Sequence, residues 1–420
     1  MRVAILNKSD ARGGAAVVTM RLLLALREAG VDARMIVCEK LTDSPYVYSA
    51  ASPWQIKRAF FAERARVFAA NGFDRATLFK TDPCTDGLPL WRHPIVKGAD
   101  IVMLNWVNQG MLSLKGIARI ASEKPIVWTM HDMWCATGIC HHAGSCERFR
   151  DRCGVCPLLG KGKGREDLSA KVHRKKMILY ERYPMHFVAV SNWLKEKCAE
   201  SSLLREGDVN VIPNPFPIDN LPPLKNKPQG RIRAVVAAAR LDDDVKGFPI
   251  LLKALKDLSE RHRDIAERLE IVYCGNIKDR TLLESTPVVW EWKGTVAPSA
   301  MPEIFQEAHL VLSSSLYETL PGTLIEGQAY GALPIAFDRG GQRDIIDSEG
   351  LGVLASFGEN EEVSAKNFAD AIVAGINICD STDSIKLASS LRESVITKFS
   401  SPQIARQYLS LLESILIKKG

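Results

Sequence analysis

The chain has 420 residues, of which 46% are hydrophobic and 25% charged, and its formal net charge is +6. This length exceeds one ordinary core and fits two α/β domains, and the composition excludes a disordered chain. The apolar run after Met1 turns polar at once, which argues against a signal peptide, and no stretch approaches the ~20 apolar residues of a spanning helix. We therefore expect a cytoplasmic protein.

Charge and cysteine content limit the partners and the compartment. Residues 1–215 carry a net positive charge and the rest a net negative one. The basic half indicates an anionic partner, such as a phospholipid surface, a lipid-linked phosphate or nucleic acid, although plain variation in surface charge explains it equally well. Ten cysteines without an export signal favour a reducing compartment, where clustered cysteines are metal ligands or free thiols.

Strand and helix patterns alternate along the chain, which is typical of parallel sheets covered by helices. The first series has strands at Arg2–Asn7, Ala33–Cys38, Ile101–Asn105, Ile126–Met130, Phe187–Val190 and Val209–Ile212. The second has strands at Ile232–Ala239, Leu269–Cys274, His309–Ser313 and Leu333–Phe337, with helices near Phe248–Glu260, Thr323–Tyr330, Ala365–Ile376 and Pro402–Ile417.

The proline-rich stretch PNPFPIDNLPPLKNKPQG separates the two series and predicts an interdomain linker. We expect an α/β protein of two Rossmann-like, doubly wound domains that face each other across a cleft. The predicted parts are an N-terminal domain at 1–214 with a cysteine-rich loop at 135–160, a linker at 215–230, a C-terminal domain at 231–398, and a C-terminal helix at 399–420 that packs back on the N-terminal domain.

The stretch SSSLYETLPGTLIEGQAYGALPIAFDRGG, residues 313–341, carries the strongest chemical signal. Glu318 comes in the loop after a buried strand, and Glu326 lies in the next helix. A carboxylate such as Glu326 can accept hydrogen bonds from both hydroxyls of a ribose. Two glutamates alone would equally fit a solvated face, but the flanking strands and the Pro-Gly turn make the whole block specific.

The same stretch offers backbone donors at a helix N-terminus. The N–H groups of Leu320, Gly322 and Thr323 suit a diphosphate or sugar hydroxyls, while Pro321 has no N–H to give.

This block resembles the E-x7-E region of retaining GT-B glycosyltransferases of sequence family 4. The resemblance implies that Glu318 lies near the transferred sugar and that Glu326 binds the nucleotide ribose. It also implies a donor of the UDP or GDP type.

A second motif, AAARLDDDVKGFPILLKAL at 237–255, is similar to the G-R-L…K-G segment of that family. By this resemblance, Arg240 and Lys246 bind the donor diphosphate. Two cations suit a leaving group whose oxygens gain negative charge, so no catalytic metal is expected. Ala239 stands where the family usually has glycine. A surface arginine and a helix-start lysine are the alternative interpretation.

The loop Ser9–Ala15 lies between the first strand and the first helix. Its small residues would let the backbone approach a ligand, and a helix N-terminus favours an anion. In the resembling family this loop covers the donor phosphate, so Gly13 and Gly14 are candidate donor-binding residues.

The segment WTMHDMWCATGICHHAGSCERFRDRCGVCPLL, residues 128–159, begins with a buried strand that His131 and Asp132 follow. In the resembling family a histidine at this point lines the sugar pocket, so both are candidate catalytic residues. A pair that only caps the strand end is the alternative.

Four cysteines come next, in a C-x5-C-x6-C-x2-C pattern typical of a structural zinc site, with His141 or His142 as a replacement for one thiolate. Loop disulfides and free thiols stay open as alternatives. The four are Cys140, Cys146, Cys153 and Cys156.

This segment narrows the resemblance to the subgroup that builds bacterial exopolysaccharide, including the colanic-acid-type transferases. The resemblance implies transfer of a hexose-type sugar, with retention, from a nucleotide-diphosphate sugar to a growing lipid-linked saccharide. The enzyme would then be cytoplasmic and peripheral at the inner membrane face. The basic amphipathic stretch Trp54–Ala70 could lie on an anionic membrane, although packing on its own sheet is the commoner arrangement.

Two other functions compete with this one. A nucleotide-sugar epimerase on the same fold would need an acid/base pair beyond the glutamates named above. A zinc-containing nucleic-acid-binding protein finds some support in the basic half and the cysteines. However, the aromatic residues do not alternate with basic ones on a strand platform, so no nucleic-acid partner is expected.

Overall fold

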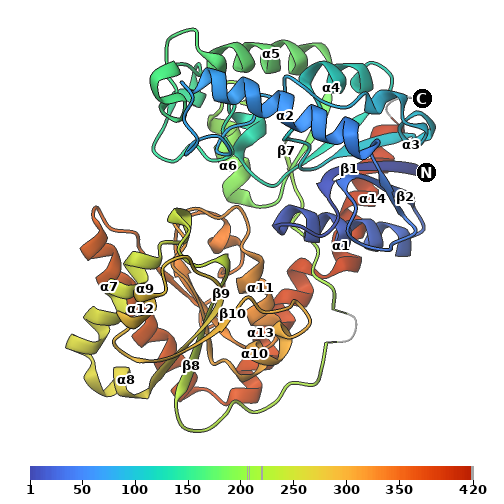
Figure 1. The fold of residues 1–420 in the computed structure, drawn as a ribbon. Coiled ribbons are helices and arrows are strands. Elements are labelled where there is room, and N and C mark those ends of the chain that lie inside the picture. The colour runs from blue at the N-terminus through green and yellow to red at the C-terminus, as the bar shows by residue number, and fades with distance from the viewer. Residues whose placement is uncertain (206, 208, 219–220, 418–420) are drawn as a thin grey trace. The chain divides into compact units, whose positions relative to one another are not determined.

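The computed structural model describes residues 1–205, 207, 209–218 and 221–417. These residues form two compact units. The first comprises residues 1–215 together with the C-terminal helix, and the second comprises residues 216–400. Each unit is an α/β domain with one parallel sheet (Figure 1), which confirms the predicted Rossmann-like fold class. Among the described residues, no helix is both long enough and apolar enough to span a bilayer.

In the described part of the first unit, seven strands pair in the order β3-β2-β1-β4-β5-β6-β7. The sheet doubles back between β1 and β4, because the chain moves outward from β1 on one side and from β4 on the other. The strands are β1 (Arg2–Ser9), β2 (Asp32–Glu39), β3 (Val47–Ser49), β4 (Ile101–Leu104), β5 (Ile126–Met130), β6 (Met185–Ala189) and β7 (Val209–Val211).

The helices of the first unit cover this sheet. Helix α14 packs against α1 in this unit although it ends the chain, and the buried hydroxyls of Tyr408 and Thr129 lie 2.9 Å apart. The helices are α1 (Gly14–Glu28), α2 (Pro53–Ala70), α3 (Pro94–Gly98), α4 (Leu114–Ala121), α5 (Leu168–Arg182), α6 (Asn192–Glu200) and α14 (Ser401–Ile417). Short 3-10 turns η1 to η4 span Leu90–Arg92, Met133–Ala136, Arg148–Arg150 and Pro157–Gly162.

The second unit repeats the plan with six described strands in the order β10-β9-β8-β11-β12-β13, so its sheet doubles back between β8 and β11. The strands are β8 (Ile232–Arg240), β9 (Leu269–Asn276), β10 (Val289–Gly294), β11 (Leu310–Ser313), β12 (Leu333–Phe337) and β13 (Val353–Ala355). The helices are α7 (Phe248–Arg261), α8 (Arg263–Arg268), α9 (Thr281–Glu284), α10 (Met301–Glu307), α11 (Gly322–Ala329), α12 (Glu361–Ser381) and α13 (Ser384–Phe399), with 3-10 turns η5 (Asp244–Lys246) and η6 (Gly341–Asp344).

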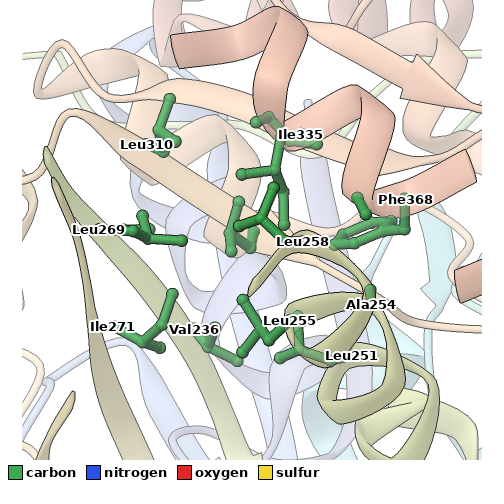
Figure 2. Close-up of a cluster of buried hydrophobic side chains, with 14 of the residues drawn as sticks. Val236, Leu251, Ala254, Leu255, Leu258, Leu269, Ile271, Leu310, Ile335 and Phe368 are labelled. Atoms are coloured by element: carbon green, nitrogen blue, oxygen red, sulfur yellow. The ribbon is translucent and has the colours of Figure 1, made fainter. Parts of the chain in front are cut away.

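Helix α7 shows why the second core forms. Leu251, Leu255 and Leu258 recur at the spacing of one helical face and are fully buried. Figure 2 shows them beside Val236 of β8 and Ile271 of β9. Apolar side chains at this spacing bury one stripe of the helix against the sheet, which holds the loops at the strand ends in place.

The interdomain linker was predicted at 215–230, and the division between the two units falls after Pro215, so the part of this stretch that the structure describes, without residues 219–220, is grouped with the second unit. The backbone N–H of Phe216 donates to Phe399 O at 2.6 Å. The Arg392 guanidinium donates to Pro222 O at 2.9 Å, and the Gln306 amide donates to Pro223 O at 3.1 Å. This proline-rich stretch is therefore tied to the second unit, because its carbonyls accept hydrogen bonds even where proline has no N–H to donate.

Candidate active site

The loops of interest in the second unit follow the carboxyl ends of two neighbouring strands. Arg240 ends β8, and Glu318 lies in the loop after β11. These strands pair at the point where the sheet doubles back. In open α/β sheets, ligands bind outside the carboxyl ends of the strands at this point. The topology therefore places the two predicted donor-binding motifs at the edge where a ligand is expected.

Lys246 and Glu318 meet across these two loops. The Lys246 ammonium lies 2.6 Å from Glu318 Oε1, and both side chains are partly exposed, at 31% and 21%. The backbone joins the loops as well, since Leu316 N donates to Val245 O at 2.8 Å and the Ser314 hydroxyl donates to Lys246 O at 2.8 Å. The two charged groups are therefore held together, yet a ligand from solvent can reach them.

Glycine at 340 allows a third loop to reach the same place. Gly340 follows β12 with φ 114° and ψ −152°, a conformation that is nearly exclusive to glycine. A Cβ there would lie 2.3 Å from the carbonyl oxygen of Glu318. The next residue, Gly341, donates its N–H to that oxygen at 2.9 Å. The backbone under Glu318 is therefore fixed by the β12 loop.

Gln342, in the same loop, is a candidate that the sequence prediction missed. Its side chain is fully buried, and within the described residues neither of its amide atoms has a hydrogen-bond partner. Buried amides are normally satisfied, so this side chain suits a polar ligand group. Its only sequence signal was its position directly after the Gly-Gly pair at 340–341.

The other predicted donor residues are placed less directly. Arg240 lies 3.3 Å from Asp242 and 3.4 Å from Asp243, so its charge is turned toward its own loop. Glu326 lies on α11, the helix after the Glu318 loop, and is half-buried. Lys246 and Glu318 contact each other. That Arg240 and Glu326 converge on the same point stays a prediction.

Helix α11 begins where the backbone donors were predicted. Pro321 caps it and Gly322 is its first residue, so the N–H groups of Gly322 and Thr323 belong to the first turn, where helices leave donors unpaired by their own carbonyls. Leu320, just before the cap, is buried. Its side chain therefore anchors the loop, and any ligand contact would come from its backbone.

The first unit has a hollow at its own doubling point. A cavity of about 360 Å³ is lined by the loop that follows β1, including Gly13 and Gly14, and by Trp106 and Gln109 after β4. The Lys8 ammonium donates to Gln109 O at 2.8 Å and links the two walls. The glycines predicted to approach a ligand thus do line a cavity.

His131 follows β5 and points toward the neighbouring strand. Its Nε2 lies 3.0 Å from Asn105 Oδ1. Burial lowers the pKa of His131 to about 4, so the ring is neutral at pH 7. The buried Nδ2 of Asn105 has no hydrogen-bond partner within the described residues. A neutral imidazole beside this amide suits recognition of a hydroxyl group and does not suit binding of an anion.

Asp132 belongs to a buried charged network. Its carboxylate accepts hydrogen bonds from Trp134 N at 2.8 Å, Trp106 Nε1 at 3.1 Å and His141 Nδ1 at 2.7 Å. The other ring nitrogen of His141 donates to Asp82 Oδ2 at 2.7 Å. These contacts give Asp132 a positioning role next to His131, and a direct catalytic role for it stays a prediction.

The charges in this network stabilise one another. Burial alone would raise the pKa of Asp132, but the facing His141 lowers it to about 2. Burial likewise works against a charged His141, and the two aspartates override it and raise its pKa to about 10. This histidine is therefore an imidazolium between two carboxylates, which argues against the prediction that it replaces a zinc thiolate, because both of its nitrogens are used as donors.

The four clustered cysteines are free thiols that line one small cavity of about 20 Å³. Burial raises the pKa of Cys140 and Cys153 to about 11. However, among the described residues no three His, Cys, Asp or Glu side chains are placed so that they could hold a metal ion. As they stand, the four thiols do not fit a zinc site, and zinc here stays a prediction for metal analysis of the purified protein.

Two Rossmann-like units, each with loops of small and charged residues at the point where its sheet doubles back, define the class of GT-B glycosyltransferase folds. A comparison of the sequence with family models adds a finding for the second unit. Residues 225–374 match the family described as Glycosyl transferases group 1.

The comparisons with individual proteins agree with this family. The chain is 24% identical over 374 residues to a protein of Escherichia coli (strain K12) described as a colanic acid biosynthesis glycosyl transferase, WcaC, and the match covers 83% of this chain and 86% of that protein.

Two solved structures share the fold over the whole chain. Anabaena Alr3699/HepE, solved in complex with UDP and glucose, aligns with a TM-score of 0.59 and 15% identity over 99% of this chain and 100% of that one. Sucrose-phosphate synthase from Thermosynechococcus elongatus aligns with a TM-score of 0.62 and 15% identity over 100% of both chains.

Proposed function

We propose that this protein transfers a hexose-type sugar, with retention, from a nucleotide-diphosphate sugar to a growing lipid-linked saccharide in bacterial surface or exopolysaccharide synthesis. The observation that carries the proposal is the meeting of Lys246 and Glu318 at the carboxyl ends of β8 and β11. It lies inside the segment that matches the glycosyl transferase family. The resemblance to WcaC supports the kind of product, and the UDP and glucose named for HepE support the kind of donor.

Each charged residue has a role in this proposal. Lys246, and Arg240 after a turn of its side chain, neutralise the charge that develops on the departing diphosphate, so the step needs no metal ion. Glu318 contacts the sugar and stabilises positive charge at its anomeric carbon. Glu326 holds the ribose. The N–H groups that begin α11 bind an anionic oxygen of the donor.

The first unit would bind the acceptor. His131 is neutral and lies beside Asn105, so the pair can exchange hydrogen bonds with saccharide hydroxyls. The net positive charge of the first unit suits an acceptor that carries a phosphate. An enzyme of this kind would work in the cytoplasm, where nucleotide sugars are available.

A ligand screen followed by a transfer assay tests the proposal. One nucleoside diphosphate should raise the unfolding temperature of the protein, because it binds only the folded state. The matching nucleotide sugars are then tested for transfer, and the anomeric configuration of the product is read by NMR. Release of nucleoside diphosphate only when an acceptor is present separates a transferase from an epimerase.

A matched pair of lysine variants makes this assay specific. Lys246→Ala should slow transfer about 100-fold or more, because it removes a charge aimed at the leaving group. Lys253→Ala is the control, since this lysine lies on α7 of the same unit and pairs with the exposed Glu361 and Glu362. No stabilisation by any nucleoside diphosphate, or equal transfer by both variants, would contradict the proposal.

A further inference from the structure

Helix α2 buries charged residues against its own unit. Glu63 is fully buried, and its carboxylate accepts backbone N–H groups from Cys84 at 2.7 Å, Thr85 at 3.1 Å and Asp86 at 3.0 Å. The next residue, Arg64, is also buried.

The two terminal nitrogens of the Arg64 guanidinium are bonded inside the unit, while its buried Nε has no hydrogen-bond partner within the described residues. The guanidinium donates to Leu78 O at 2.6 Å and pairs with the buried carboxylate of Asp82. The inner face of α2 is thus held by hydrogen bonds and ion pairs as much as by apolar contact.

The opposite face of α2 carries aromatic residues. Trp54, Phe61 and Phe68 recur with Arg58 and Ala65 at the spacing of one helical stripe. Trp54 is 69% exposed and Phe61 is 65% exposed. A surface helix ordinarily turns its large apolar side chains inward, whereas α2 buries two charged side chains and exposes two large aromatic ones beside its other basic residues. Exposed aromatic rings in a stripe are a feature of an interaction surface.

The turn after α2 extends this surface. Phe73 is 69% exposed and Phe79 is 57% exposed. Ring contacts join them to the helix: Phe60 lies 5.5 Å from Phe61 and 6.4 Å from Phe79 between ring centroids, and Phe68 lies 5.3 Å from Phe73. The aromatic rings therefore form connected groups along one side of the unit.

Phe73 is held outward by a strained backbone. Its φ of 67° is an outlier for an aromatic residue. The side chain of Asn71 fixes this turn, because it donates to Asp74 O at 2.6 Å and accepts from Asp74 N at 3.1 Å. Such strain persists only where the surrounding structure enforces it, and it recurs at functional positions.

Exposed charge beside these rings is basic. Residues 53–80 contain two acidic residues, Glu63, which is buried, and Asp74, which is half-buried. The Asp74 carboxylate accepts hydrogen bonds from Ala76 N at 2.9 Å and from the Thr77 hydroxyl at 3.1 Å. The exposed basic residues of this stretch are Lys57, Arg58, Arg66, Arg75 and Lys80, of which Arg66 pairs with Asp86.

We propose that this aromatic–basic face, formed by Trp54, Phe61, Phe73 and Phe79 with the basic residues just named, docks on an anionic lipid bilayer. The rings enter the boundary between headgroups and acyl chains, and the cations contact lipid phosphates. Aromatic residues and Arg are also common in interfaces between proteins, so the argument for lipid rests on charge. Residues 53–80 expose basic side chains while their two acidic residues are buried or half-buried, and this excess of cations is complementary to an anionic lipid surface.

Vesicle flotation with the full chain tests this docking. We expect binding to vesicles that contain phosphatidylglycerol, weaker binding to phosphatidylcholine alone, and release as salt rises because exposed charges are screened. The affinity of the triple variant Phe61→Ser, Phe73→Ser, Phe79→Ser for the anionic vesicles should be at least about tenfold lower than that of the parent. Because these side chains are exposed, the variant should unfold at the temperature of the parent.

The control variant changes exposed apolar residues of the second unit, Val289→Ser, Val363→Ser and Ile396→Ser, which are 41%, 38% and 38% exposed. It should float with vesicles as the parent does. The proposal is overturned if the parent ignores anionic vesicles, if both triple variants bind equally, or if sedimentation shows self-association through this face that the phenylalanine variant abolishes. Nucleoside-diphosphate binding, measured on the same variants, is independent of this outcome, so the docking and the proposed transfer can fail separately.

Discussion

Replacing Gly340 with alanine should disturb the candidate site from beneath. The glycine adopts φ 114° and ψ −152°, which costs another residue about 1–3 kcal/mol. A Cβ there would lie 2.3 Å from Glu318 O and 2.7 Å from Gln342 Oε1, and relieving such overlap costs about a further 1–3 kcal/mol. We therefore expect Gly340→Ala to lower the free energy of unfolding by about 2–6 kcal/mol.

Gly350→Ala is the matched control. Gly350 also has a positive φ, of 78°, but a Cβ there meets nothing within 4 Å, so its cost should be about 1–2 kcal/mol. Calorimetry measures both losses. Because the overlap at position 340 displaces the backbone of Glu318, Gly340→Ala should also slow sugar transfer by up to about 100-fold, while Gly350→Ala should not. If the two variants unfold at the same temperature and transfer sugar at the same rate, then the close contact between the Gly340 loop and the Glu318 loop contributes neither to stability nor to transfer.

Two further predictions concern buried charge. Arg64→Met should destabilise the first unit by about 3–5 kcal/mol, because it removes one of the two cations that pair with the buried Asp82 carboxylate and leaves only His141, whereas Arg66→Met breaks the more exposed pair with Asp86 and should cost under about 1 kcal/mol. Equal losses in urea unfolding would argue against a buried pair. Burial lowers the pKa of His309 to about 4, below the 6.5 of an exposed histidine, so the unfolded chain takes up the proton first. Stability should therefore be full above pH 6.5 and fall between pH 6.5 and 4, and the variant His309→Gln should show a shallower fall in its urea midpoint.

The alternation of strand and helix patterns was enough to predict the fold. A parallel strand is buried on both faces, so it appears in the sequence as a short, continuous apolar run. The motif around Glu318 and Glu326 was visible for a similar reason, since loop and helix N-terminus are local in sequence. Helix α13 was missed because Ser384–Phe399 has five serine or threonine positions among its apolar ones, which blurs the helical period.

Long-range polar pairs were beyond the sequence prediction. Asp132 and His141 lie nine residues apart in one segment, but Asp82 is 59 residues from His141, and no local pattern indicates that one imidazolium joins both carboxylates. The orientation of α2 was hidden in the same way. Glu63 and Arg64 look like solvent-facing residues until their partners, 18 to 23 positions away, are known. Without knowledge of those partners, the hydrophobic pattern of α2 predicts that its aromatic face is buried and that Glu63 and Arg64 face solvent.

The contact between Lys246 and Glu318 has a consequence for the order of events at the proposed donor site. A lysine that already holds a carboxylate at 2.6 Å must give up that contact to bind a diphosphate. The donor then competes with Glu318 for the cation, and the displaced carboxylate becomes available to the sugar. Binding and catalysis would thus place opposite demands on Glu318.

This competition gives Glu318→Gln effects of opposite sign. The neutral amide holds Lys246 less firmly, and a partly exposed ion pair contributes about 0.5–1 kcal/mol, so the nucleoside diphosphate should bind about two- to fivefold tighter. Transfer should nevertheless slow, since the charge beside the anomeric carbon is lost. Glu361→Gln, which relaxes the exposed pair with Lys253, should change neither quantity. Calorimetric titration and transfer kinetics on the three proteins decide the matter, because weaker binding by Glu318→Gln would mean that the carboxylate positions the lysine for the diphosphate and does not compete with it.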